Sequence, residues 1–178
     1  MPFQNSNLFF RSMAFFLKVR DLFMSPGNVL KEVKIKAGAA VLDFGCGPGR
    51  YIPALAERVG PEGRIYALDI HPLASRIVRK LADKKGIPGL KTIVSDCATG
   101  LPDESIDLTL LFDILHALDD PGPILAEISR VLKPEGILSV SDHHLKQPVI
   151  LDRIGRSGLF EPVQKGLRVV NFGKKNRS

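Results

Sequence analysis

The sequence predicts an α/β fold in which a mostly parallel sheet is flanked by helices. From residue 39 onward, short apolar segments alternate with amphipathic segments, a pattern typical of strands joined by helical crossovers. A glycine-rich turn follows the first apolar segment directly, and a hairpin signal lies near the end of the chain. Together these features predict a doubly wound sheet with one antiparallel addition at its edge.

The first strand–helix units follow from local patterns. Residues 41–44 are apolar except for Asp43, which suits a strand buried on both faces. Residues 50–59 carry apolar side chains on one helical face. A second strand over residues 64–69 ends in an acid, and the next helix begins at His71-Pro72 and ends at Gly86.

The middle of the chain repeats this pattern. Further strands are expected at residues 91–95, 107–112 and 137–141. Between the last two, Asp120 is a plausible N-cap and Pro121 suits the first turn of a helix that ends near Lys133.

The C-terminal part differs. We expect a short helix over residues 148–154, then strands over 159–164 and 167–172 joined by Lys165-Gly166. Such a hairpin would add an antiparallel strand to the sheet edge.

Residues 1–38 form a separate N-terminal extension before the main domain, 39–178. Six of the ten phenylalanines fall in this extension, and residues 6–24 have a helical apolar pattern. Packing on the main domain, a lid over an apolar substrate, and shallow attachment to a membrane interface all explain this surface. After a break at Pro26-Gly27, residues 29–33 are predicted to begin a short helix.

The composition indicates a globular protein. The chain has 178 residues, of which 44% are hydrophobic and 25% charged. No apolar run approaches the roughly 18 residues of a membrane span, and signal-peptide features are absent, so a cytoplasmic location is expected. The two cysteines, Cys46 and Cys97, make neither a metal cluster nor a disulfide framework.

The turn after residue 44 is the candidate ligand-binding segment. Gly45, Gly47 and Gly49 alternate, so the chain can adopt positive φ angles and a ligand can approach bare backbone. NAD enzymes place their third glycine one residue later, where this chain has Arg50. That difference disfavours an NAD-linked oxidoreductase, which stays as an alternative. Asp43, just before the turn, can hold loop N–H groups or a ligand ammonium.

Residues 41–49, Val-Leu-Asp-Phe-Gly-Cys-Gly-Pro-Gly, resemble the first motif of class I S-adenosylmethionine-dependent methyltransferases. Further matching segments are Ala67–Asp69, Ser95–Cys97, Leu101-Pro102, Asp107–His116 and Glu127–Gly136. The last segment is typical of the methyltransferase type 11, quinone-biosynthesis-like branch. The resemblance spans about residues 39 to 142 and implies a Rossmann-like, seven-stranded sheet in the order 3-2-1-4-5-7-6.

The resemblance also implies S-adenosylmethionine as cofactor and a set of binding residues. Asp69 would accept from the ribose hydroxyls and Asp96 from the adenine amino group, while the Phe112 carbonyl would accept from the ammonium. Ile70 would lie against the adenine, and the Cys97 N–H would point at a ring nitrogen. The implied cofactor-binding residues are Asp43, Gly45, Cys46, Gly47, Gly49, Asp69, Ile70, Asp96, Cys97 and Phe112.

Methyl transfer from a sulfonium mainly needs alignment, and a base only where the acceptor loses a proton. Candidate bases are His116, His143 and His144, although a lone loop histidine is more often simply hydrogen-bonded. The His143-His144 pair lacks a third ligand at a defined spacing, so no metal site is predicted.

The predicted acceptor is a small apolar or aromatic molecule, because the phenylalanine-rich helix and residues 143–147 would line its pocket, with a second subunit as an alternative contributor. A non-catalytic S-adenosylmethionine-binding protein is a further alternative. The net charge of +6 arises from residues 143–178, so a nucleic-acid acceptor is a less favoured option.

Overall fold

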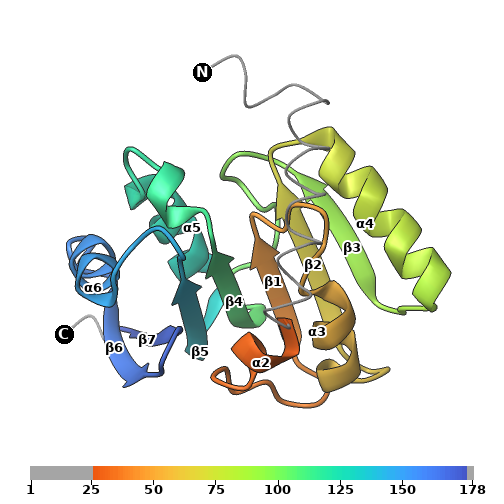
Figure 1. The fold of residues 1–178 in the computed structure, drawn as a ribbon, viewed down its shortest axis with the longest axis horizontal. Coiled ribbons are helices and arrows are strands. Elements are labelled where there is room, and N and C mark those ends of the chain that lie inside the picture. Colours follow the sequence, from red (N-terminus) through yellow and green to blue (C-terminus); the bar gives the residue numbers. More distant parts are fainter. Residues whose placement is uncertain (1–25, 176–178) are drawn as a thin grey trace.

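The computed structural model describes residues 26–175, which build one seven-stranded sheet in the order β3-β2-β1-β4-β5-β7-β6 (Figure 1). The strands are β3 Leu90–Val94, β2 Arg64–Asp69, β1 Ala40–Phe44, β4 Ile106–Phe112, β5 Leu132–Ser141, β7 Val170–Lys174 and β6 Phe160–Lys165. The first five pair in parallel, whereas β7 runs antiparallel to both β5 and β6. The predicted fold class and strand order are confirmed.

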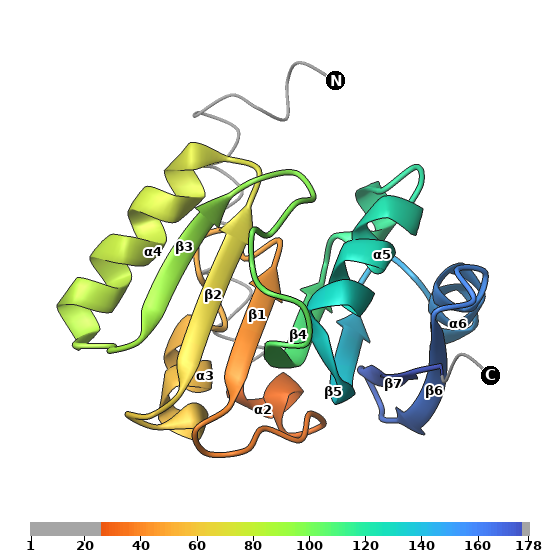
Figure 2. The ribbon, with the colours of Figure 1, turned by 180° about the vertical axis from the view of Figure 1, so that it is seen from behind.

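Helices cover both faces of the sheet. Helices α2, α3 and α4 pack on one face, and α5 and α6 pack on the other, as the two opposite views show (Figures 1 and 2). The helices are α2 Pro26–Leu30, α3 Ile52–Val59, α4 Pro72–Lys85, α5 Gly122–Val131 and α6 Gln147–Gly155, with a 3-10 turn, η2, at Leu115–Ala117.

Successive side chains of β1 enter different cores, which explains why this strand has no polar face. Val41 packs with Ile52 and Leu55 beneath α3, whereas its neighbour Leu42 packs with Leu125 beneath α5. Because both faces are covered, the central strands must be apolar almost throughout. Burial on both faces therefore suits β1 to its position inside the sheet, between β2 and β4.

Helix α4 begins and ends as predicted. His71 is its N-cap, and the His71 Nδ1 accepts a hydrogen bond from the Leu73 N–H at 3.1 Å. Gly86 closes the helix in the left-handed conformation, at φ +60°. In α5, by contrast, Pro121 and not Asp120 occupies the N-cap position, although Asp120 Oδ1 still accepts from the Gly122 N–H at 2.8 Å.

Strand β5 starts five residues earlier than predicted. It begins at Leu132, directly after α5, so the segment 133–136 that was expected to end the helix belongs to the strand. Pairing with β4 is irregular there, since the register shifts between Ile106 and Leu108. Such a bulge accommodates Pro134, which cannot donate a regular ladder hydrogen bond.

Two other boundaries also differ. Residues 26–30 are helical from the first described residue, so the predicted break at Pro26-Gly27 is wrong, and the helix expected to begin at Val29 ends at Leu30. The last strand, expected over 167–172, is instead 170–174, because the Glu32 carboxylate Oε2 accepts from the N–H groups of Arg168 and Val169 at 2.9 and 3.0 Å. These residues form a loop held by a distant side chain.

The loop between β3 and β4 is anchored to α5 by Glu127. Its Oε1 accepts from the Thr99 N–H at 2.8 Å and from the Thr99 hydroxyl at 2.6 Å. Arg130 donates to the same carboxylate and to the Leu101 carbonyl. The hydrogen bonds from Arg130, and then those from Thr99, lower the pKa of Glu127 to about 2 against the opposing effect of burial.

Over residues 26–175 no helix combines the length and the apolar character that a bilayer crossing needs. The phenylalanine-rich helix predicted over residues 6–24 lies outside the described residues.

The glycine turn after β1 should not tolerate a side chain at Gly49. This residue has φ +80°, and a Cβ there would lie 2.9 Å from Val78 Cγ2. Gly38 has a similar φ of +75° but nothing within 4 Å of the same position. We expect Gly38→Ala to cost about 1–2 kcal/mol of unfolding free energy from backbone strain, and Gly49→Ala about 2–4 kcal/mol, because overpacking is added. Urea unfolding measures both; equal losses would contradict the packing argument.

The Glu127 network should make stability depend on acidity. Because the folded-state pKa is lowered from 4.5 to about 2, its contribution is present above the unfolded value and is lost as the pH falls between these values. We expect Glu127→Gln to reduce the free energy of unfolding by about 1–3 kcal/mol at pH 7, and the gap to wild type to narrow below pH 4.5. Denaturant unfolding at several pH values tests this, with Glu135→Gln, an exposed glutamate, as the control.

Candidate active site

The carboxyl ends of the parallel strands lie at one edge of the sheet. At β1 the order in which successive strands are added changes from one side to the other. Strand β2 pairs with one side of β1 and β4 with the other. Ligands of open α/β sheets bind at such a switch point, outside the carboxyl ends of the strands. The predicted site residues lie along this edge.

The turn after β1 is tied to β2 by its backbone. The N–H groups of Gly45 and Cys46 both donate to the Leu68 carbonyl, at 2.8 and 2.9 Å. Gly45, Gly47 and Gly49 have φ angles of +81°, +52° and +80°, as the sequence led us to expect. Among residues 26–175, a Cβ on Gly47 would meet nothing within 4 Å, so no described side chain fills the space beside this part of the turn, and a ligand can lie on its backbone.

Asp69, at the end of β2, holds this turn in place. Its Oδ2 accepts from the Gly47 N–H and its Oδ1 from the His71 N–H, both at 2.8 Å. One carboxylate therefore joins the glycine turn to the beginning of α4. Each carboxylate oxygen can accept a second hydrogen bond, so the two ribose hydroxyls of a nucleoside remain suitable partners.

Asp43 is buried inside β1, only 2% exposed, beside this carboxylate. Its Oδ2 is buried and has no hydrogen-bond partner within the described part of the chain. Burial, and then the charge of Asp69, raise the pKa of Asp43 to about 7. An unpaired buried carboxylate oxygen is costly, and a donor group of a ligand would satisfy it.

The residues predicted around an adenine ring lie beyond β2 and β3. Ile70 is 58% exposed and Val94, which ends the neighbouring strand, is 49% exposed, so an apolar surface is open at this edge. Asp96 is exposed as well. The Cys97 N–H, expected to face a ring nitrogen, donates instead to Ser95 Oγ at 3.2 Å, so that contact requires the serine hydroxyl to turn away.

The two cysteines remain thiols in these surroundings. Burial, followed by the charges of Asp43 and Asp69, raises the pKa of Cys46. Burial, together with nearby carboxylates, also raises the pKa of Cys97. Because the thiolate is the reactive form, neither residue is suited to act as a nucleophile.

The three candidate bases come together although 26 residues separate the first from the others. His116 lies in η2, whereas His143 and His144 follow β5. The ring centroid of His144 is 4.3 Å from that of His116 and 3.9 Å from that of His143. We call these three residues the histidine cluster.

Two carboxylates that we did not single out in the sequence hold the histidine cluster. Asp142, whose side chain is fully buried, accepts from His116 Nδ1 at 2.9 Å, and Asp113 Oδ1 lies 2.8 Å from His143 Nδ1. Asp113 follows β4 and Asp142 follows β5, as Asp69 ends β2. The recurrence of an aspartate at strand ends was the signal that could have revealed them.

The histidine side and the glycine side of the site are adjacent. A Cβ on Gly45 would lie 2.6 Å from Ile114 Cγ2, so the segment that leads into η2 packs directly on the glycine turn. The Phe112 ring, at the end of β4, packs edge-on against Tyr51 with centroids 5.0 Å apart. The carboxyl ends of β1, β2, β4 and β5 therefore form one continuous candidate site.

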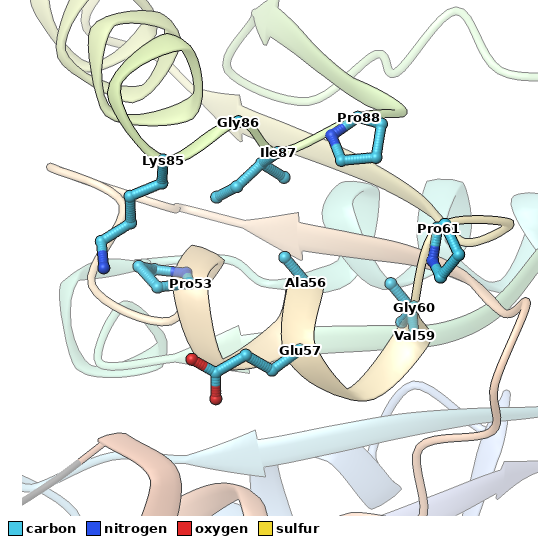
Figure 3. Close-up of a pocket in the computed structure, with 10 residues that line it drawn as sticks. All are labelled: Pro53, Ala56, Glu57, Val59, Gly60, Pro61, Lys85, Gly86, Ile87 and Pro88. Atoms are coloured by element: carbon cyan, nitrogen blue, oxygen red, sulfur yellow. The ribbon is translucent and has the colours of Figure 1, made fainter.

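A surface pocket of about 490 Å³ lies elsewhere, along α3 and beside the carboxyl end of α4 (Figure 3). Pro53, Ala56 and Glu57 line it from α3, and Lys85 and Ile87 from the end of α4 and the following loop. None of the residues that line it belongs to the predicted site. Its position near the amino ends of β2 and β3 separates it from the carboxyl edge.

Comparison with known families identifies the domain. Residues 35–166, most of the chain, match the family model described as "Methyltransferase domain". The demethylmenaquinone methyltransferase of Geobacillus stearothermophilus is 29% identical over 136 residues, which cover 76% of this chain and 58% of that protein. The ubiquinone/menaquinone biosynthesis C-methyltransferase UbiE of Hydrogenovibrio crunogenus is 35% identical over 119 residues, 65% of this chain and 47% of its own. The chain thus spans about half the length of the curated relatives it matches.

Solved structures agree with this assignment. A methyltransferase of Aquifex aeolicus described as SAM-dependent superposes with a TM-score of 0.73 at 25% identity, over 84% of this chain and 88% of its own. One from Methanococcus maripaludis shows the same fold, with a TM-score of 0.79 at 17% identity, over 96% and 93% of the two chains. Family, strand order and glycine turn agree, and the chain therefore belongs to the methyltransferase domain family of class I, S-adenosylmethionine-dependent type.

Proposed function

We propose that this protein transfers a methyl group from S-adenosylmethionine to a small apolar or aromatic molecule. The observation that carries the proposal is the turn at Gly47, which is open within the described part of the chain, flanked by Asp69 and by an Asp43 oxygen that no described residue pairs. A ligand with an ammonium group at one end and a ribose at the other matches these groups in charge and hydrogen-bonding capacity.

Each part of the cofactor has a matching element. The buried Asp43 and the Phe112 carbonyl are assigned to the ammonium end, and Asp69 to the ribose. Ile70 offers its exposed apolar face to the adenine. Asp96, which follows Val94, the partner of Asp69 in the pairing of β2 with β3, is assigned to the adenine amino group. Gly47, whose Cβ position is open among the described residues, would leave room for the methionine portion, and Gly45, Cys46 and Gly49 complete the turn around it.

When bound, S-adenosylmethionine supplies an already activated methyl group, so the protein has little covalent chemistry to perform. The rigid glycine turn and Asp69 fix the donor, and the loops after β4 and β5 orient the acceptor; such alignment is worth several kcal/mol of barrier lowering. For an acceptor that must lose a proton, His116, His143 and His144 are the candidate bases. Their rings gather next to the segment that packs on the glycine turn.

The names of the relatives support an aromatic or quinone-like acceptor. Those names describe methylation of demethylmenaquinone and of aklanonic acid. We propose the same broad chemical class here, with residues 39–178 as the methyltransferase domain and residues 1–38 as an N-terminal extension, of which α2 packs on that domain. The helix predicted as a lid over the acceptor, residues 6–24, lies outside the described residues. A cytoplasmic location remains part of this proposal.

Two other functions make different predictions. A non-catalytic binding protein would take up the cofactor but methylate no acceptor. An NAD-linked oxidoreductase would be stabilised by NADH and not by S-adenosylhomocysteine. Thermal-shift measurements with both ligands separate the second option directly.

Asp69→Ala should weaken the binding of S-adenosylhomocysteine. The substitution removes the acceptor for the ribose hydroxyls and for the Gly47 N–H. We expect a loss of about 1–3 kcal/mol, or roughly 5- to 150-fold in Kd, by isothermal titration calorimetry. Asp83→Ala, an exposed acid on α4, is the matched control. If the folded wild type binds neither cofactor form, the proposed function is wrong; unchanged affinity in the variant would contradict only the assignment of Asp69.

His144→Ala should impair methyl transfer without affecting cofactor binding. Its exposed ring lies in the histidine cluster, on the acceptor side. In an assay with quinol, phenol, thiol and amine acceptors, we expect transfer to aromatic hydroxyl compounds and at least a tenfold loss of kcat/KM in this variant, with the Kd for S-adenosylhomocysteine within twofold of wild type. Cofactor binding without transfer to any acceptor would favour the non-catalytic alternative. Salt-sensitive RNA binding would favour a nucleic-acid acceptor.

A further inference from the structure

Three possible metal ligands meet at the carboxyl ends of β4 and β5. Asp113 follows β4, and Asp142 and His143 follow β5. The two strands pair in parallel with Phe112 opposite Ser141, so the pairing register itself brings the next residues, Asp113 and Asp142, alongside each other. One ligand atom from each of Asp113, Asp142 and His143 can be chosen so that all three lie within 4.8 Å of one another.

Existing hydrogen bonds hold these ligands in position. The Asp142 carboxylate is fully buried and accepts from the N–H groups of His116 at 3.0 Å and His144 at 2.9 Å. Asp113 Oδ1 accepts from the His143 N–H at 3.1 Å and lies 2.8 Å from the His143 ring nitrogen Nδ1. The ligand set is therefore largely preorganised, which lowers the cost of binding an ion.

The charges favour a cation at this position. Two carboxylates that approach so closely in partly buried surroundings repel each other, and a positive charge between them relieves that repulsion. Neutral imidazole with two carboxylates is a ligand set for zinc and its first-row neighbours, whereas Mg²⁺ and Ca²⁺ prefer ligands that are all oxygen.

The distances are compatible with one ion. Ligands at about 2.0–2.2 Å from a shared metal can be no more than about 4.4 Å apart. The observed limit of 4.8 Å is slightly larger, so a small rotation of the exposed His143 side chain completes the arrangement.

We propose that Asp113, Asp142 and His143 bind one divalent transition-metal ion at the acceptor side of the site. His116 holds the Asp142 carboxylate in its orientation through the hydrogen bond at His116 Nδ1. The sequence did not predict this site, because Asp113 follows β4 whereas Asp142 and His143 follow β5, so the three ligands form no local motif. Metal binding goes beyond the proposed methyl transfer and is measured without cofactor or acceptor.

The experiment is a Co²⁺ titration of the full chain, freed of purification tags and dialysed against a chelator. Co²⁺ reports its ligands through visible absorption, and calorimetry with Zn²⁺ gives a second measurement. We expect one Co²⁺ per chain, and at least a tenfold weaker affinity in Asp113→Asn and in His143→Gln. Asp142→Asn should have the same effect, but because that side chain is fully buried, the conclusion rests on the other two variants.

Two control variants remove the same residue types elsewhere. Asp103→Asn changes an exposed acid that pairs with Arg130, and His71→Asn replaces a helix cap with another good capping residue. Both should bind Co²⁺ like wild type. Circular dichroism verifies that every variant is folded.

Absence of one-to-one binding at millimolar Co²⁺ would overturn the proposal, as would equal affinity in wild type, Asp113→Asn and His143→Gln. Calorimetry of S-adenosylhomocysteine on the same metal-free protein tests the proposed function separately, so failure of one leaves the other standing.

Discussion

The parallel pairing of β1 with β2 and β4 is the constraint on which the site depends. It brings the ends of strands from distant parts of the sequence to one edge, where their last side chains can meet. Asp69 uses that position to join the glycine turn and α4 through two hydrogen bonds of 2.8 Å. On the other side of β1, the parallel pairing of β4 with β5 places Asp113 beside Asp142. Both halves of the site are thus consequences of one sheet geometry.

The carboxyl edge of the sheet carries two residues in energetically unfavourable environments. Asp43 occupies a central strand, has a buried oxygen that finds no partner among residues 26–175, and has its pKa raised to about 7. Asp113 is a non-glycine residue with φ +58°, a sparsely populated conformation. Such local costs persist where the surrounding packing is strong, and here they lie directly above two well-packed cores. The stability that the two cores provide therefore offsets the burial of Asp43 and the unfavourable backbone conformation of Asp113.

Features encoded by adjacent residues were predictable from the sequence. The apolar run at residues 41–44, the alternating glycines and the cap at His71 led to the sheet, the turn and α4. Features that depend on distant partners were not predictable. The last strand starts at Val170 because Glu32, far away in sequence, holds the preceding loop, and β5 starts early because a bulge accommodates Pro134. Asp142 was missed for the same reason, since its role depends on His116 across the strand pair.

The two halves of the site differ in what they are made of. The glycine side consists mainly of backbone N–H groups and one carboxylate that braces them, so few substitutions leave it intact. The histidine side consists of side chains on two loops, held by Asp113 and by the fully buried Asp142. The proposed function therefore assigns the methyl donor to the glycine side and the acceptor to the side chains at the ends of β4 and β5.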